Sequence, residues 1–308
     1  MSRADTNGTI GAEALHVKGW WRSHRWLWLR RASQVSILGL FLLGPVADVW
    51  WVKGNLASSL TLDTLPLTDP YVLLQGLAAG HLPATAALTG ALIVTVFYLL
   101  VGGRAYCAWV CPVNSITDAA QWLRGRFGIN TATRLSGKSR FWMLGLTFLL
   151  AAVTGSIVWE LINPVSMLHR GLIFGFGLGW AVVLGVFLLD LLVSKRAWCG
   201  HLCPVGAFYS LLGHVSPLRV SAARRAQCND CMDCYAVCPE PQVIRPALKG
   251  EADGRGPMIL DAQCTNCGRC IDVCSRDVFQ FGLRFNNSIT THVMKSVKPL
   301  AGKTEVLS

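Results

Sequence analysis

Charged residues are scarce in this chain of 308 residues: Asp, Glu, Lys and Arg make up 15%, whereas hydrophobic residues make up 52%. A soluble domain usually contains about 25% charged residues. The shortage argues against an ordinary soluble protein and predicts that part of the chain lies in lipid. The length allows one large domain or two modest ones.

Several cofactor motifs are also missing. The chain has no Cys-x-x-Cys-His sequence, which excludes covalently attached haem c. It has no P-loop and no Gly-x-Gly-x-x-Gly opening a dinucleotide-binding unit, so no bound nicotinamide or flavin is indicated. His81 and His169 lie at the ends of apolar runs, so a haem b held by two buried histidines is not expected.

Four apolar runs are long enough to cross a bilayer, which needs about 20 residues of helix. The third run, FWMLGLTFLLAAVTGSIVW, contains no charge, whereas the first contains Pro45 and Asp48. A buried helix of a soluble core could explain one such run but not four. We therefore predict an α-helical membrane protein with four transmembrane helices. The predicted spans are residues 34–51, 85–102, 141–159 and 172–193.

Basic residues alternate between the segments that separate these runs. Residues 1–33, 52–84, 103–140, 160–171 and 194–308 contain 6, 1, 6, 1 and 14 Lys or Arg, respectively. Because loops rich in Lys and Arg stay in the cytoplasm, this pattern predicts a multi-pass protein of a bacterial inner membrane with both termini and its clusters cytoplasmic. Topology explains the net charge of +11, so membrane lipid is the expected partner and nucleic acid is not.

All 12 cysteines fall in spaced motifs, and eight form the pattern of a bacterial two-cluster ferredoxin. CNDCMDCYAVCPEP begins at Cys228 and CTNCGRCIDVCS begins at Cys264. In this pattern the fourth cysteine of each motif ligates the other [4Fe–4S] cluster. Zinc is the alternative, but zinc sites do not need a doubled pattern of eight cysteines. The predicted ligands are Cys228, Cys231, Cys234 and Cys274 for cluster 1, and Cys264, Cys267, Cys270 and Cys238 for cluster 2.

The other four cysteines belong to a repeat. RAYCAWVCPV at residues 104–113 returns as RAWCGHLCPV at residues 196–205. If each copy is helical, its two cysteines share one face, and two copies at the same depth supply four thiols. A third metal or iron–sulfur site, a thiol–disulfide pair and a structural corner all remain open. The four cysteines are Cys107, Cys111, Cys199 and Cys203.

These motifs divide the chain into four parts. A cytoplasmic or interfacial segment precedes a four-helix membrane domain that carries both C-x3-C-P motifs. A small α+β ferredoxin domain with two [4Fe–4S] clusters follows, and a flexible tail ends the chain. The predicted boundaries are residues 1–33, 34–215, 216–285 and 286–308.

Longer segments resemble the NapH family of ferredoxin-type proteins over about residues 15–285. The resemblance implies a membrane component of a quinol dehydrogenase. Such a component passes electrons from the quinol pool, with the periplasmic ferredoxin-type protein NapG, towards the c-type cytochromes that feed periplasmic nitrate reductase. The matching segments include GWWRSHRW at 19–26, LTLDTLPLTDP at 60–70, GHLPATAALTGA at 80–91 and WCGHLCPVGA at 198–207.

Quinol oxidation releases two electrons and two protons, so a quinol dehydrogenase needs proton acceptors as well as clusters. An ionisable residue near an apolar run is a candidate, although surface and helix-capping roles are the alternatives. The candidates are Glu160, Asp190 and His169, followed by His81, Asp63 and Asp69.

Two other functions stay open at this stage. The chain could donate electrons for the maturation or maintenance of a metalloenzyme. It could also be a membrane anchor or scaffold for a partner ferredoxin, with its clusters as structural staples.

Overall fold

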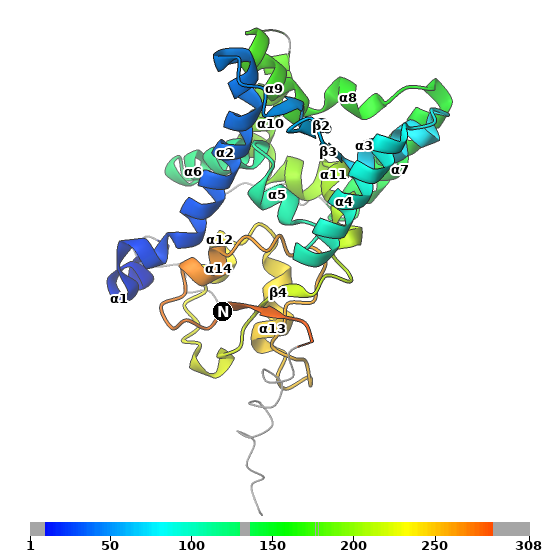
Figure 1. The fold of residues 1–308 in the computed structure, drawn as a ribbon. Helices are drawn as coiled ribbons and strands as arrows, with labels where there is room; N and C mark the ends of the chain where they lie inside the picture. Colours follow the sequence, from blue (N-terminus) through cyan, green and yellow to red (C-terminus); the bar gives the residue numbers. More distant parts are fainter. Residues whose placement is uncertain (1–9, 130–135, 176, 178, 286–308) are drawn as a thin grey trace, which may run out of the picture.

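The computed structural model describes residues 10–129, 136–175, 177 and 179–285. In the view of Figure 1, the helices from α2 to α11 form the upper part of the molecule, and the C-terminal segment from β4 onwards lies below them. Helix α14 of this lower segment contacts α1 and α2, so the two ends of the described chain pack together. The predicted tail, residues 286–308, lies outside the described residues.

The first third of the chain is helical, with one small antiparallel sheet. Asp69 caps the N-terminus of α3, where its side chain accepts a hydrogen bond from the Tyr71 backbone N–H (3.0 Å). Pro70 occupies the first helical position. Proline suits this position because its missing N–H would have no partner there. The helices are α1 (Ala12–Ser23), α2 (Arg25–Ala47), α3 (Pro70–Ala78) and α4 (Thr85–Val101). The strands are β1 (Val52–Gly54), β2 (Ser58–Thr61) and β3 (Leu65–Thr68).

In both copies of the repeat, the proline after the second cysteine separates two helical elements. Pro112 caps α6, and Pro204 is the first residue of α11. Because proline cannot continue the preceding helix, each cysteine pair spans a break rather than lying on one continuous helix. The helical elements are α5 (Ala105–Trp109), α6 (Val113–Arg126), α7 (Ser139–Thr154), α8 (Val158–Ile162), α9 (Pro164–Phe174), α10 (Gly179–Leu188), the π-helical turns η1 (Leu189–Val193) and η2 (Trp198–Leu202), and α11 (Pro204–Leu212).

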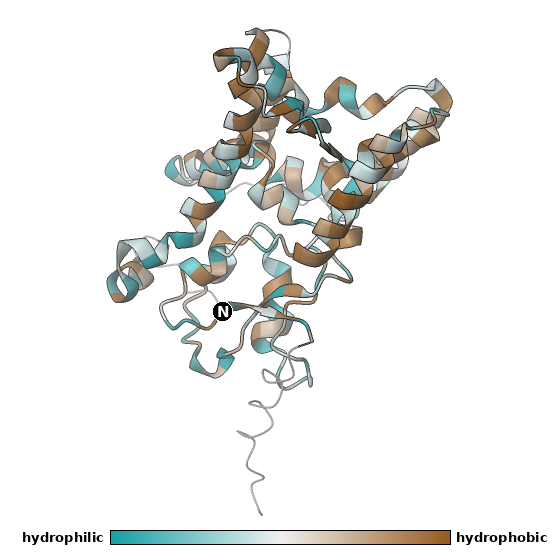
Figure 2. Cartoon of the chain, viewed as in Figure 1, coloured by the Kyte–Doolittle hydropathy of each residue, from teal (hydrophilic) through white to brown (hydrophobic). Residues whose placement is uncertain are grey.

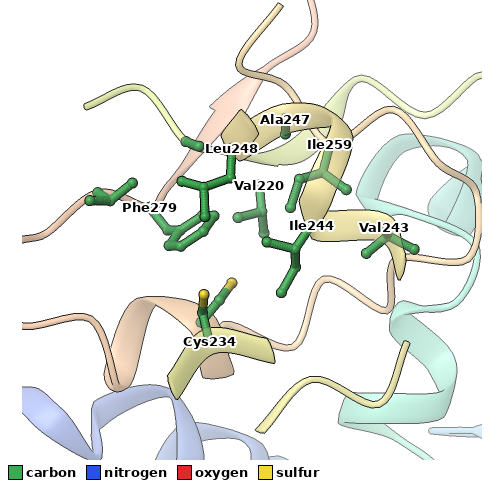
Figure 3. Close-up of a cluster of buried hydrophobic side chains, with 11 residues drawn as sticks. Val220, Cys234, Val243, Ile244, Ala247, Leu248, Ile259 and Phe279 are labelled. Carbon is green, nitrogen blue, oxygen red and sulfur yellow. The ribbon is translucent and has the colours of Figure 1, made fainter. Parts of the chain in front are cut away.

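The C-terminal segment has the small α+β ferredoxin fold that the cysteine spacing predicts. Strands β4 (Leu218–Ser221) and β5 (Gln280–Leu283) pair in antiparallel fashion. Figure 3 shows Val220, Ile244, Ile259 and Phe279 gathered in its core, with Cys234 at the lower side of this cluster. The remaining elements are η3 (Arg225–Gln227), α12 (Asp233–Val237), η4 (Pro241–Val243), α13 (Ile244–Lys249) and α14 (Arg269–Asp272).

Asp118 on α6 ties these parts together. Its carboxylate pairs with Arg31 of α2, with Arg196 before η2, and with Arg269 of α14, whose Nη2 lies 2.6 Å from Oδ2. Burial opposes ionisation of Asp118, but the three guanidinium groups hold its pKa well below the usual range. The Asp118 carboxylate therefore connects helix α2, the second repeat copy and the ferredoxin fold.

The prediction of four transmembrane helices was wrong. Within the described part of the chain, no helix combines the length and hydropathy needed to cross a membrane. Helices α4, α7 and α10 have 17, 16 and 10 residues, against about 20 for a span. Helix α2 is longer, with 23 residues, but it begins with Arg25 and contains Pro45 near its end. The predicted multi-pass inner-membrane topology rested on these spans and loses its support.

Large apolar side chains nevertheless stay exposed on the upper helices, where Figure 2 shows much of the ribbon coloured as hydrophobic. Such exposed patches commonly mark contacts with another protein or with a membrane. Examples on α4 and α7 are Leu92, Phe97, Trp142, Leu149 and Val153.

Candidate metal centres

The first candidate centre is a small cavity in the ferredoxin fold. Its apolar wall includes Leu248, Val278 and Phe279. All four cysteines predicted for cluster 1 line it, namely Cys228, Cys231, Cys234 and Cys274. The fold therefore carries Cys274 from the second motif back to the three cysteines of the first.

The second candidate centre mirrors the first. It is another small cavity, and Glu240 and Arg269 are among the residues that line it. The four cysteines predicted for cluster 2 line it, namely Cys238, Cys264, Cys267 and Cys270. The exchange of fourth cysteines expected for a two-cluster ferredoxin is thus present in the geometry. Among the residues the structure describes, no three His, Cys, Asp or Glu side chains are placed to hold a single metal ion.

The four thiols of each cavity lie close together. Burial, followed by the neighbouring thiols of Cys231 and Cys228, raises the pKa of Cys234 to about 12. Burial likewise raises the pKa of Cys264 to about 11. A metal cluster reverses this effect because coordinated cysteine is held as thiolate. The cysteine sets therefore fit a multi-iron group.

Buried arginines add positive charge to the second cavity. The Arg30 side chain is 1% exposed, and its Nε and Nη1 have no hydrogen-bond partner within the described residues. Burial opposes thiolate formation at Cys267, but Arg269 and Arg30 hold the pKa of this thiol below its usual range. Two buried guanidinium groups near Cys267 suit a cluster that carries negative charge.

The third candidate centre contains the four cysteines of the repeat. The two copies come together around a small cavity. Tyr106, Trp159 and Trp198 line much of the rest of it. All four repeat cysteines line this one cavity, namely Cys107, Cys111, Cys199 and Cys203. The repeat therefore forms a single site from two half-sites.

The thiols of the third cavity are also set in low-polarity surroundings. Burial raises the pKa of Cys203 to about 12 and raises that of Cys107, against the opposing charge of Arg104. The four cysteine residues are partly buried rather than fully buried. Arg140, with no exposed side-chain surface, contributes further positive charge near Cys107.

An ion-pair network joins the third cavity to the second. Arg104 Nη1 donates to Glu240 Oε1 (2.6 Å), and Arg104 Nη2 donates to the Cys199 carbonyl (3.3 Å). Arg140 Nη1 donates to the same Glu240 oxygen (3.2 Å). Burial opposes ionisation of Glu240, but Arg104 holds its pKa below the usual range. Glu240 lines the second cavity. Its carboxylate is therefore connected to the third cavity through Arg104, which also donates to the Cys199 carbonyl.

A hydrogen bond also connects the first repeat copy to the second ferredoxin motif. The indole Nε1 of Trp109, which lies between the cysteines of the first repeat copy, donates to the Asn266 carbonyl (3.0 Å). Asn266 lies between Cys264 and Cys267 of the second ferredoxin motif. The third cavity thus packs directly against a ligand loop of the second.

Two of the predicted proton acceptors, Glu160 and His169, lie apart from these cavities. Glu160 accepts hydrogen bonds from Asn163 Nδ2 (2.9 Å) and Ser166 Oγ (2.8 Å) at the start of α9. His169 is buried, with its ring centroid 5.5 Å from that of Phe41. Neither side chain lines any of the three cavities. A role for them in proton transfer stays a prediction.

Asp190 is also buried. Its Oδ1 accepts from the Trp198 backbone N–H (2.9 Å), and burial raises the pKa of its carboxyl to about 6. This contact anchors η2 rather than presenting the carboxylate to a cavity. Asp69, a lesser candidate in the sequence, does line the third cavity. Sequence reasoning missed Arg30, Arg104 and Glu240, although Arg104 opens the first repeat copy and recurs as Arg196 in the second.

Models of known families match the cysteine-containing parts of the chain. A 4Fe-4S binding domain matches residues 83–130 and 176–221, which carry the repeat. A 4Fe-4S dicluster domain matches residues 227–278. Fold and sites together define an iron–sulfur electron-transfer protein of the ferredoxin type.

Curated relatives show which family of ferredoxin-type proteins the chain resembles. Ferredoxin-type protein NapH of Escherichia coli K12 is 52% identical over 92% of this chain and 98% of its own length. Two methylamine utilization ferredoxin-type proteins MauN are also similar. That of Methylorubrum extorquens is 52% identical over 91% of the chain and 96% of its own length, and that of Paracoccus denitrificans is 55% identical over 80% and 86%. The chain belongs to this NapH/MauN family of ferredoxin-type proteins. No solved structure matches it.

Proposed function

We propose that this chain oxidises quinol and passes the electrons through iron–sulfur clusters towards periplasmic nitrate reductase. The class of iron–sulfur electron carrier comes from the fold, the cysteine sites and the relatives. The quinol donor and the nitrate reductase acceptor come from the resemblance to NapH. The MauN relatives are named for methylamine utilization, so the final acceptor is the part of the proposal that most needs its own test.

One observation carries the proposal: the three cysteine-lined cavities form a continuous series. The third contacts the second through Arg104 and Glu240. The second lies beside the first, since the thiols of Cys270 and Cys234 interact electrostatically. An electron entering at the third cavity can therefore leave at the first without crossing an unrelated part of the protein.

The cavities would hold three [4Fe–4S] clusters, each of which exchanges electrons one at a time when bound. In this proposal the first two clusters have the ligand sets that the ferredoxin spacing predicts. The third has one pair of ligands from each repeat copy. Its ligands would be Cys107, Cys111, Cys199 and Cys203.

We further propose a bacterial membrane as the source of quinol, with lipid contacting the exposed apolar side chains of α4 and α7. Leu92 and Val153 are 64% and 75% exposed on these helices, which is unusual for such residues unless something covers them. Partners that receive the electrons would be the ferredoxin-type protein NapG and downstream c-type cytochromes.

Rapid mixing tests the electron-transfer step. The protein is purified without oxygen, oxidised, and mixed with decylubiquinol while the visible absorbance and the EPR signal of reduced clusters are followed. We expect the absorbance to bleach and the EPR signal to appear. If dithionite reduces the clusters but decylubiquinol does not, quinol is not the donor.

A further inference from the structure

A large apolar cavity adjoins the third cysteine cavity. It has a volume of about 420 Å³ and lies between α2, the small sheet and α4. Its walls are almost entirely hydrophobic, and this matches the usual composition of a site for an apolar ring. Representative wall residues are Ile37, Phe41, Leu67, Ile93 and Phe97.

One end of this apolar cavity is polar. Asp69, which is 8% exposed, lies there with Tyr98, Tyr106 and Tyr209. Asp69 Oδ1 accepts from the Tyr71 backbone N–H (3.0 Å) and from the Tyr209 hydroxyl (3.2 Å). Both of these hydrogen bonds reach Oδ1, so Oδ2 is the oxygen free to meet a ligand.

The polar end is also the wall shared with the third cysteine cavity. Leu56, Asp69 and Tyr106 line both cavities. A ring held in the apolar cavity with its hydroxyl at Asp69 therefore lies one side chain away from the four repeat cysteines. The arrangement brings a proton acceptor and an electron-accepting site to the same end of one apolar pocket.

We propose that the apolar cavity binds the quinol ring and that Asp69 accepts its hydroxyl protons. This inference rests on the proposed function and names the site where the reaction occurs. The quinol loses two electrons and two protons and becomes the quinone. The protons leave in turn through the Asp69 carboxylate to water, and the two electrons reduce two oxidised iron–sulfur clusters of this chain, one electron each.

The electrostatic surroundings suit a base at Asp69. Burial raises the pKa of Asp69 to about 6, so the carboxylate is ionised at neutral pH but is more basic than an ordinary aspartate. Burial also raises the pKa of Tyr106 and of Tyr209, which therefore stay neutral. The titratable groups that face Asp69 are Tyr71, Tyr98, Tyr106, Tyr209 and Glu160.

Two substitutions test the site in the cluster-loaded protein. Asp69→Asn keeps an oxygen for the Tyr71 and Tyr209 hydrogen bonds but removes the base. Ile93→Trp fills the apolar cavity. Matched controls are Asp48→Asn, an exposed aspartate that accepts a hydrogen bond from the Trp50 indole, and Leu92→Trp, on the same helix as Ile93 but outside the cavity. Iron content equal to that of the wild type confirms that each variant is folded and loaded.

Two readouts separate binding from chemistry. Calorimetric titration with decylubiquinone measures ring binding without electron transfer. We expect Ile93→Trp to weaken binding at least about tenfold and Asp69→Asn to change it by less than about threefold. Rapid mixing with decylubiquinol should show Asp69→Asn slowed by about 100-fold, because a general base contributes about 10²–10⁴ in rate.

The pH profile gives a third readout. Wild-type reduction should slow as the pH falls through about 6, and the Asp69→Asn variant should lose this dependence. If quinol reduces the wild type but both variants behave like their controls, this site is wrong and the proposed function stands. If the wild type neither binds decylubiquinone nor is reduced by decylubiquinol, the proposed function and this inference both fail.

Discussion

The chain builds four-cysteine cavities in two different ways. The ferredoxin cavities draw all their ligands from one segment, residues 228–274, in which three cysteines of each set follow one another on a tight loop. The third cavity draws pairs from residues 104–113 and 196–205, which meet only after α5, η2 and α11 have packed. A contiguous motif places its ligands by local backbone geometry, whereas a split motif depends on tertiary contacts.

The charges around the first cavity also differ from those around the second and third cavities. Buried Arg104 and Arg140 share Glu240 between the second and third cavities. At the first cavity, Lys249 pairs with Asp230 where both side chains are about half exposed. Buried pairs depend on both partners, whereas exposed pairs contribute little. Substitutions around the third cavity should therefore have larger effects than those around the first.

The largest effect is expected from Glu240→Gln. This substitution removes the carboxylate between Arg104 and Arg140 and leaves two buried guanidinium groups without their counter-charge. We expect the free energy of unfolding to fall by about 3–5 kcal/mol, measured by chemical denaturation. Glu251→Gln, at an ion pair whose carboxylate is exposed, is the control and should be close to wild type. Equal stability of the two variants would show that Glu240 does not support the cavities.

The stabilisation from the Arg104–Glu240 ion pair should depend on pH in a defined direction. The pKa of Glu240 is depressed in the folded chain because, against the cost of burial, Arg104 favours the carboxylate. Its stabilising contribution is present above the ordinary glutamate pKa of about 4.3 and is lost as the pH falls through the folded value. The stability difference between wild type and Glu240→Gln should therefore be constant near neutral pH and shrink in acid. A difference that grows in acid would contradict this assignment.

A smaller effect is expected at Arg30, beside the second cavity. Reduction adds negative charge to a cluster, and a nearby guanidinium favours the reduced form. Arg30→Met should lower the reduction potential of the cluster there by about 60 mV, a tenfold change in the one-electron equilibrium. An EPR-monitored redox titration measures this, with the exposed Arg276→Met as control. An unchanged potential would place the cluster away from Arg30.

The smallest effect is expected at the first cavity. Lys249→Ala removes an exposed ion pair with Asp230, and water replaces such contacts at little cost. Denaturation should show no measurable change in the free energy of unfolding. A clear loss of stability would mean that the first cavity depends on charge as strongly as the third does.

The cysteine spacing predicted which cysteines of the ferredoxin part lie together, and their ligation of clusters stays a prediction. Both four-cysteine sets line the cavities that the spacing implies, because the ligand loops are short and local. The repeat left three interpretations open, since no sequence pattern shows that residues 107 and 199 share a cavity. Asp69 was underrated for a similar reason: its sequence context, Asp-Pro at a helix start, indicates a cap, and only packing places it between two cavities.

The helical part was predicted least well. Apolar composition marked four runs correctly as hydrophobic, but it did not predict where the helices end. Gly155 ends α7 in a left-handed conformation at φ 65°, which glycine adopts without strain. The final run continues as a short α10 and a π-helical turn. Hydropathy averages over such breaks, so it overestimated the length of α7 and α10, which have 16 and 10 residues.

Counting iron and acid-labile sulfide per chain tests the central claim, that the split repeat forms a cluster site equal to the two ferredoxin sites. The count is made on anaerobically purified wild type and on the Cys107→Ser/Cys199→Ser variant. Three [4Fe–4S] clusters predict about twelve irons and about twelve sulfides in the wild type, falling to about eight of each in the variant. About eight in both proteins would contradict the claim and leave the repeat as a thiol pair or a structural corner.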